Sequence, residues 1–201
     1  MTALFLSVFW ALVANAQVLS DKLYEANTVS FADGAPFALS KVKKNKATVF
    51  ITMLPGCPIC QKQAYTLNEL VLKYKDHGIS FWGVWYPGVD SLEMRKYIKE
   101  QNLLFPILTD EDCGITMLLE SEIAPDVVVV DANLKVLYRG KIDNWFEAVG
   151  KRKPKPTEFF LDNALNAIVE GKKVPIATTK PVGCIIECAR RIKVGQALPG
   201  R

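Results

Sequence analysis

The chain has 201 residues, half of them hydrophobic, and a formal net charge of +4. This length and composition fit one domain with a sizeable core and short extensions. Acidic and basic residues are intermixed, and no basic stripe with interleaved aromatics stands out, so we expect no nucleic-acid partner.

Residues 1–16 have the pattern of a secretory signal peptide. They carry no charged side chain, and residues 4–13 form an apolar run of suitable length. Ala14, Asn15 and Ala16 fit a cleavage site, which predicts a mature chain that starts near Gln17 and is exported to the periplasm or the extracellular space. The run is too short to span a bilayer, which takes ~20 residues. Because no Lys or Arg precedes the run, a buried N-terminal helix is the alternative.

The next segments predict a short hairpin, a loop and a buried strand. Apolar stretches flank Asp33-Gly34, a pair typical of a tight hairpin turn. Residues 41–46 are mostly basic and predict an exposed loop. Residues 47–54 are almost continuously apolar, which favours a parallel strand covered on both faces.

Two cysteines follow this strand at the predicted start of a helix that runs to about Lys75. Free backbone N–H groups and the helix dipole stabilise a thiolate at the first of them, Cys57. Pro58 suits the first helical turn, and Cys60 lies about one turn further on, within reach of Cys57. The arrangement favours a redox dithiol in which Cys57 is the nucleophile and Cys60 the resolving thiol. A permanent, inert disulfide is the alternative.

The remaining chain alternates between helical and extended patterns, which predicts an α/β sandwich around a mixed sheet. Ser91 is the expected N-cap of the next helix, and the only histidine, His77, ends the first one, where a surface position is expected. Residues 172–201 form a tail that we expect to be partly irregular. The expected elements are strands at 79–85 and 105–109, helices at 92–101 and 111–120, two strands around a turn at 131–135, and a helix from 156–157 to Gly171.

Three segments carry a resemblance to the thioredoxin superfamily. The strand–Cys-x-x-Cys–helix order is one, and its Cys-Pro-x-Cys form is similar to glutaredoxin-type motifs. Residues 122–143 resemble the Pro-strand-Asp to Tyr-Arg-Gly-x-Ile-Asp segment of redoxin domains of the alkyl hydroperoxide reductase and thiol-specific antioxidant type, with Leu134 where that pattern has a turn glycine. Residues 179–186 are similar to the Gly-Cys-x-Ile tail of a secreted redoxin group.

The resemblance spans residues 29–186 and implies a thioredoxin-like fold, with a central mixed sheet flanked by helices. It implies a domain at 17–171 followed by a C-terminal extension at 172–201. It also implies that Pro125 is a cis-proline beside the dithiol, where Ala124, Pro125 and Pro58 contact a substrate chain. An ordinary trans proline at a strand start is the alternative.

The other cysteines leave several pairings open. Cys184 and Cys188 form a structural disulfide with each other, pair with Cys113, or serve as a second dithiol that relays electrons to the first. Cys113 alone reads as a small buried hydrophobic residue. A zinc tetrathiolate from the first dithiol and the tail pair needs an unusual Cys-x3-Cys half-site, so we expect no metal. No phosphate-binding glycine loop stands out, and we expect no cofactor.

The function that these features favour is an exported thiol–disulfide oxidoreductase acting on protein disulfides, with an upstream redox partner. A peroxiredoxin-like peroxidase is the alternative, since one segment resembles redoxins. Peroxiredoxins carry Pro-x3-Thr-x2-Cys, however, and here Leu54 and Cys57 stand at the threonine positions before Cys57 and Cys60. A non-enzymatic metal–thiolate binding module is the third reading.

Overall fold

The structure is a computed structural model. The predicted signal peptide, part of the predicted hairpin and the end of the tail lie outside the residues that it describes, and the signal peptide stays a prediction. The predicted hairpin is not supported, because residues 28–30 form a strand that pairs with residues 108–110, and the described residues 34, 35 and 37 are not in a strand. None of the described helices is long and apolar enough to cross a membrane. The described residues are 28–30, 32, 34–35, 37, 40–85 and 90–188.

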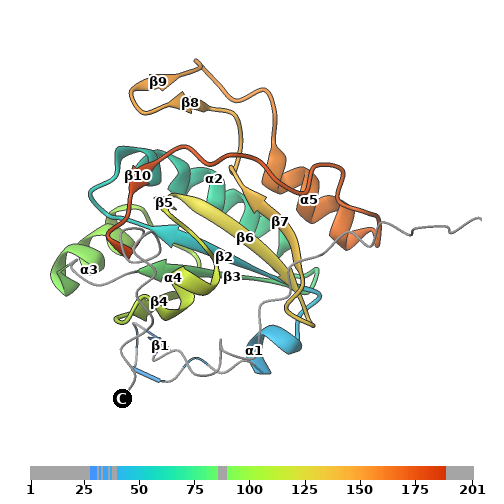
Figure 1. Ribbon diagram of the computed structural model, residues 1–201, viewed down its shortest axis with the longest axis horizontal. Coiled ribbons are helices and arrows are strands. Elements are labelled where there is room, and N and C mark those ends of the chain that lie inside the picture. Colours follow the sequence, from blue (N-terminus) through green and yellow to red (C-terminus); the bar gives the residue numbers. More distant parts are fainter. Residues whose placement is uncertain are drawn as a thin grey trace, which may run out of the picture.

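A six-stranded mixed sheet forms the centre of the molecule, in the order β1-β4-β3-β2-β6-β7 (Figure 1). Strand β2 pairs in parallel with β3 and antiparallel with β6. This confirms the predicted α/β fold around a mixed sheet. The strands are β1 (Thr28–Ser30), β2 (Ala47–Met53), β3 (Ile79–Trp85), β4 (Ile107–Asp110), β6 (Asp126–Asp131) and β7 (Val136–Gly140).

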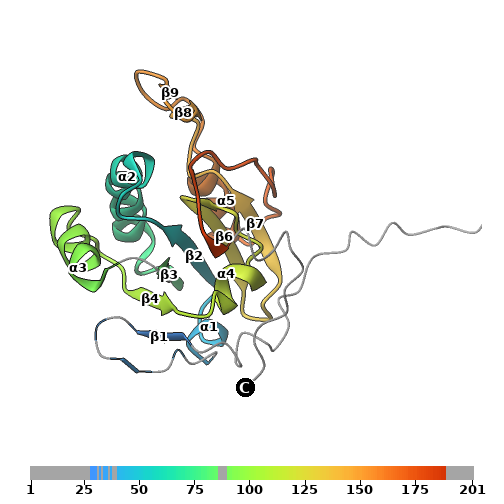
Figure 2. The same cartoon turned by 60° about the vertical axis from the view of Figure 1, so that its left-hand side comes forward.

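Helices cover both faces of the sheet, with α2 and α3 on one side of β2 and α4 on the other (Figure 2). Side chains alternate along a strand, so Val49 and Ile51 pack with α2, α3 and α5, whereas Phe50 packs with α1 and α4. Both sets are buried, which explains the continuous apolar run of β2. The helices are α1 (Ser40–Lys43), α2 (Pro58–Tyr74), α3 (Ser91–Glu100), α4 (Gly114–Leu118) and α5 (Phe160–Val169).

Three local predictions need correction. The basic segment at 41–46 contributes to α1, because the fully buried Val42 anchors it to the core. Asp90 rather than Ser91 caps α3, since its carboxylate accepts the backbone N–H of Leu92. Helix α4 starts later than predicted because the buried Asp110 carboxylate accepts the N–H groups of its first turn at 2.9 and 2.8 Å.

Leu134 occupies the turn position where the redoxin pattern has glycine. Its φ is +64°, in the left-handed region that strains a side-chain-bearing residue. The side chain is nevertheless buried, against the cluster that contains Phe50 and Val130. Asp131 tightens the turn by accepting the N–H groups of Asn133 and Lys135. Burial of an apolar side chain thus offsets the cost of the backbone conformation.

Two small sheets stand outside the central one. Strands β8 (Phe146–Ala148) and β9 (Lys151–Arg152) form a protruding hairpin (Figure 1). Strand β5 (Ile123–Ala124) pairs with β10 (Cys184–Ile185), which belongs to the tail. The tail is otherwise irregular between residues 172 and 188, as predicted. The domain boundary at 171–172 stays a prediction.

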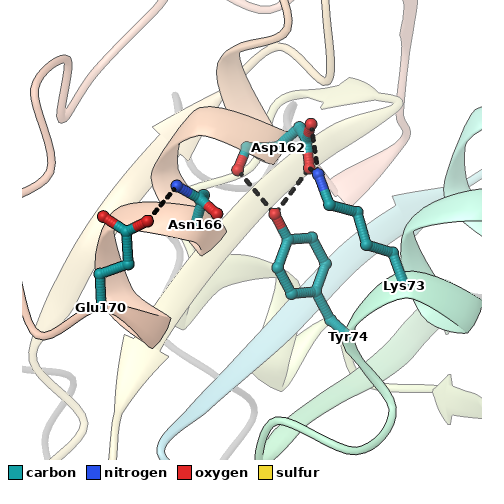
Figure 3. A network of polar contacts seen from close by, with 5 residues as sticks. All are labelled: Lys73, Tyr74, Asp162, Asn166 and Glu170. Carbon is teal, nitrogen blue, oxygen red and sulfur yellow. Dashed lines mark hydrogen bonds and ion pairs between the residues drawn. The ribbon is translucent and has the colours of Figure 1, made fainter.

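A polar network joins the end of α2 to α5 (Figure 3). The Tyr74 hydroxyl donates to the Asp162 carboxylate at 2.6 Å, and Lys73 Nζ lies 2.6 Å from the same carboxylate. Burial, and then Asp162, raise the pKa of Tyr74, so this hydroxyl stays a donor. The network holds α5 against the helix that carries the dithiol.

Buried Asp126 opens β6 directly after Pro125. Its Oδ2 accepts from the Ser121 hydroxyl at 2.9 Å, while its Oδ1 has no hydrogen-bond partner in the described part of the chain. Desolvation by burial raises the pKa of Asp126 to about 6, although the hydrogen bond from Ser121 and the charge of Arg139 both act to lower it. The folded protein therefore binds a proton here at pH values where the unfolded chain has lost it.

We predict that Tyr74→Phe lowers the free energy of unfolding by ~1.5 kcal/mol, because it removes a part-buried hydrogen bond to a charged acceptor. Lys73→Ala is the matched control on the same carboxylate. The Lys73 side chain is 52% exposed, so its removal should cost less than ~1 kcal/mol. Urea unfolding of both variants measures the difference, and a larger loss in the lysine variant would contradict the assignment.

We predict that ionisation of Asp126 makes the protein less stable as pH rises. The native pKa is raised above the unfolded value, so stability falls between about pH 4 and pH 6 and then levels off, by at most about 3 kcal/mol from this group. Asp126→Asn should remove that part of the decline, whereas Glu69→Gln on the exposed face of α2 should not. Urea unfolding across this pH range measures it, and parallel curves for wild type and Asp126→Asn would refute the prediction.

Candidate functional site

The predicted dithiol lies where β2 leads into α2. Cys57 is the N-cap residue of α2, with an extended backbone and no capping hydrogen bond from its side chain, and Pro58 stands exposed in the first turn. The Cys57 N–H donates to the Leu54 carbonyl at 3.0 Å, and the Cys57 carbonyl accepts the Gln61 N–H at 3.1 Å. The position expected for Cys57 is confirmed, and its sulfur is not used to cap the helix.

Cys60 lies in the interior of the protein. Only 1% of it is exposed, and desolvation raises the pKa of its thiol to about 12. The Tyr97 hydroxyl, from α3, is also buried and has no hydrogen-bond partner among the described residues. Burial first, and then Cys60, raise the pKa of Tyr97. At pH 7 the Cys60 thiol therefore keeps its proton. Cys60 is therefore unsuited to be the first attacking group.

Pro125 and Ala124 stand beside Cys57. The Ala124–Pro125 peptide bond is cis, the isomer that the resemblance implied. The Ala124 carbonyl oxygen lies 3.3 Å from Cys57 Sγ, although 67 residues separate the two in sequence. The structure thus brings Cys57 and Ala124 together as predicted, while a contact of either with substrate stays a prediction.

The tail covers this site. Cys184 lies opposite Ala124 and Ile185 opposite Ile123 in the antiparallel pairing of β10 with β5. Figure 1 shows where these two strands lie. A Cβ on Gly183 would come within 2.1 Å of the Ala124 carbonyl oxygen. Only glycine therefore allows the tail to approach so closely. Cys57 is fully buried beneath it.

The disulfides of the structure differ from the expected ones. Cys57 is joined to Cys184 and Cys113 to Cys188, with Cα–Cα separations of 6.1 and 5.8 Å, and Cys60 is free. The expected Cys57–Cys60 bond is therefore not the one present, and the tail cysteines do not pair with each other. The reason is that β10 pairing sets Cys184 opposite Ala124, next to Cys57, while Cys188 reaches the start of α4. Pairing of a tail cysteine with Cys113, one of the open alternatives, is confirmed.

The alternative of a zinc tetrathiolate is not assembled. Three of its four cysteines are joined in the two disulfides. Across residues 40–85 and 90–188 and the few described before them, no group of three or more His, Cys, Asp and Glu side chains is placed to hold a metal ion.

Gln63 and Asp143 form a polar pair beside Pro125, in the wall of a small cavity. Gln63 Nε2 donates to Asp143 Oδ1 at 2.8 Å, and the Trp145 N–H donates to the same oxygen at 2.8 Å. Within the part of the chain that the structure describes, Asp143 Oδ2 and Gln63 Oε1 have no hydrogen-bond partner, and desolvation by burial raises the pKa of Asp143. Asp143 lines the pocket. The cavity is lined by Ile59, Gln63, Pro125, Lys141, Ile142, Asp143, Phe146 and Val182.

Two polar residues of this site were missed by the sequence analysis. Gln63 follows Cys60 by three positions on the buried face of α2, and Tyr97 stands on the buried face of α3. A polar side chain at a position that helical periodicity marks as buried is the signal that could have found them.

Solved structures of similar fold come from several bacteria. An uncharacterised conserved protein from Geobacillus kaustophilus is 27% identical, with a TM-score of 0.68 over 79% of this chain and 85% of that one. A hypothetical protein from Sinorhizobium meliloti is 19% identical, with a TM-score of 0.68 over 80% and 89%. A secreted disulfide oxidoreductase of Mycobacterium tuberculosis, homologous to E. coli DsbE, is 20% identical, with a TM-score of 0.51 over 72% and 93%. These likenesses confirm the thioredoxin-like fold.

A match to a family model identifies the family of the chain. No curated protein matches the chain. The Redoxin family model matches residues 20–146, well over half of the chain, and this stretch holds the dithiol and Pro125 but ends before the tail with Cys184 and Cys188. The chain therefore belongs to the Redoxin family of the thioredoxin superfamily.

Proposed function

We propose that the protein is a thiol–disulfide oxidoreductase that acts on extended segments of protein clients. One observation carries this proposal. Cys57, at the N-terminus of α2, is bonded to a cysteine of an extended strand that pairs with β5. This is the arrangement expected of a mixed disulfide between the enzyme and a polypeptide client, here formed with the protein's own tail.

The proposed reaction begins with attack by Cys57. Its thiolate forms a bond to one sulfur of a client disulfide, and the other client sulfur leaves as a thiolate that takes up a proton. The Ala124 carbonyl, 3.3 Å from Cys57 Sγ, accepts a hydrogen bond from the thiol before it ionises. The backbone of β5 binds the client strand, with Pro125 and Pro58 at its sides.

Cys60 completes the proposed reaction. Its sulfur attacks Cys57 Sγ, a Cys57–Cys60 disulfide forms, and the second client sulfur leaves with the proton that Cys60 gives up. The client gains two electrons and the dithiol loses them, so a dithiol-carrying redox partner must reduce the enzyme again. Burial keeps Cys60 protonated and away from clients, which supports a resolving role.

Export of the protein is part of this proposal. Residues 1–16 predict a signal peptide, and two disulfides among the described residues suit an oxidising compartment. The M. tuberculosis protein of the same fold is described as a secreted disulfide oxidoreductase. The periplasm or the extracellular space would then supply the protein disulfides on which the enzyme acts.

We predict that Cys57→Ser abolishes reduction of a model protein disulfide such as that of insulin, because the attacking sulfur is gone. Cys60→Ser is the matched control three residues away. It should retain the first attack, release the client more slowly, and accumulate mixed disulfides at Cys57. Turnover of the reduced proteins and mass spectrometry of trapped complexes measure both.

Undiminished turnover in the Cys57→Ser variant would refute the proposed function. Peroxide consumption with a sulfenic acid on Cys57, in a protein that does not reduce disulfides, would also refute it and favour the peroxidase.

A further inference from the structure

We propose that Cys184 is a third redox-active cysteine, and that Cys184 and Cys60 alternate as the disulfide partner of Cys57. This inference rests on the proposed function and extends it. Residues 182–186 would occupy the place of a client strand, so that the tail is an internal substrate. The Cys57–Cys184 disulfide is then a reactive bond, whereas Cys113–Cys188 is a structural one.

The contacts of the tail strand support this view. Besides the pairing of Cys184 with Ala124, the Ile186 N–H donates to the Glu122 carbonyl at 3.1 Å. Side chains alternate along the strand: Ile185 is 74% exposed, while Ile186 is fully buried in the cluster that contains Cys57. The site therefore recognises three features of the tail: its backbone, the glycine before the cysteine, and the apolar residue two positions after the cysteine.

Both ends of this segment are anchored independently of the Cys57–Cys184 bond. The Thr179 N–H donates to the Arg139 carbonyl at 2.9 Å, and the Lys141 N–H donates to Thr179 Oγ1 at 2.8 Å. At the other end the buried Cys113–Cys188 disulfide anchors the tail to α4. A short tether of this kind keeps a group at an effective concentration on the order of mM, so Cys184 stays near Cys57 when their bond opens.

The exchange needs no outside oxidant. Cys60 loses its proton and attacks Cys57 Sγ, the Cys57–Cys60 bond forms, the Cys57–Cys184 bond breaks, and Cys184 leaves as a thiolate that takes up a proton. One disulfide is present before and after the step. Cys184 is partly exposed whereas Cys60 is buried. The step therefore moves a thiol from the interior to a position that a redox partner can reach.

Clients that displace the tail should share its pattern. Any residue with a Cβ before the reacting cysteine would collide with the Ala124 carbonyl, as a Cβ on Gly183 would. An apolar residue two positions after the cysteine would replace Ile186 in its buried site. We infer that suitable client segments carry a glycine, a cysteine, any residue and then an apolar residue.

Trapping of a client disulfide at Cys57 gives the first test. In Cys60→Ser, Cys184 should still attack the mixed disulfide and release part of the client. Adding Cys184→Ser should raise the trapped fraction about threefold or more, and adding Ile185→Ala should leave it unchanged. Equal trapping in Cys60→Ser and in Cys60→Ser/Cys184→Ser would overturn the role of Cys184 without affecting the proposed function, which depends on Cys57.

Disulfide mapping of the full chain across a series of glutathione buffers gives the second test and needs no client. We expect Cys57–Cys184 and Cys57–Cys60 to be found together and to titrate reversibly, while Cys113–Cys188 persists. Gly183→Val should lower the Cys57–Cys184 fraction about tenfold in favour of Cys57–Cys60, and Ile185→Val should not. A Cys57–Cys184 bond that resists reduction as Cys113–Cys188 does, or a Cys184 never joined to Cys57, would overturn the proposal.

Discussion

The pairing of β10 with β5 is the interaction on which the site depends. It sets Cys184 opposite Ala124, and Ala124 lies against Cys57, so one short antiparallel contact determines which sulfur Cys57 meets. The close approach requires a glycine at position 183. The central sheet and its helices serve to hold β5 and the start of α2 at the distance that this contact needs.

In the proposed reaction, the position of each of the three sulfurs in the fold determines its chemical role. Cys60 is enclosed by the core and keeps its proton, whereas Cys57 lies at a helix N-terminus, where a thiolate is stabilised. Cys184 lies partly exposed on a strand anchored at both ends. Disulfide exchange requires an ionised sulfur in contact with a disulfide. The order of the proposed steps therefore follows from where each sulfur lies and how it is tethered.

The sequence predicts the elements whose periodicity is local. The apolar run of β2, the helical spacing of α2 and the position of Cys57 between them follow from short-range patterns, and the structure confirms them. The partners of the tail cysteines could not be predicted in the same way, because the two disulfides join residues 127 and 75 positions apart. Their pairing depends on how the tail docks, which no local pattern encodes. Leu134 shows the same limit, since its strained φ is tolerated through packing against distant strands.

The most informative experiment is pulsed alkylation of the native chain after the Cys57–Cys184 bond has been reduced. It tests whether the tail covers Cys57 as a displaceable strand and whether Cys57 is the reactive thiol. We predict that iodoacetamide modifies Cys57 about tenfold faster than Cys60 at pH 7, since the thiolate is the nucleophile and reduction of the Cys57–Cys184 bond frees the strand to leave. Modification of Cys60 before Cys57, or a Cys57 that stays unmodified after Cys184 has reacted, would contradict the account.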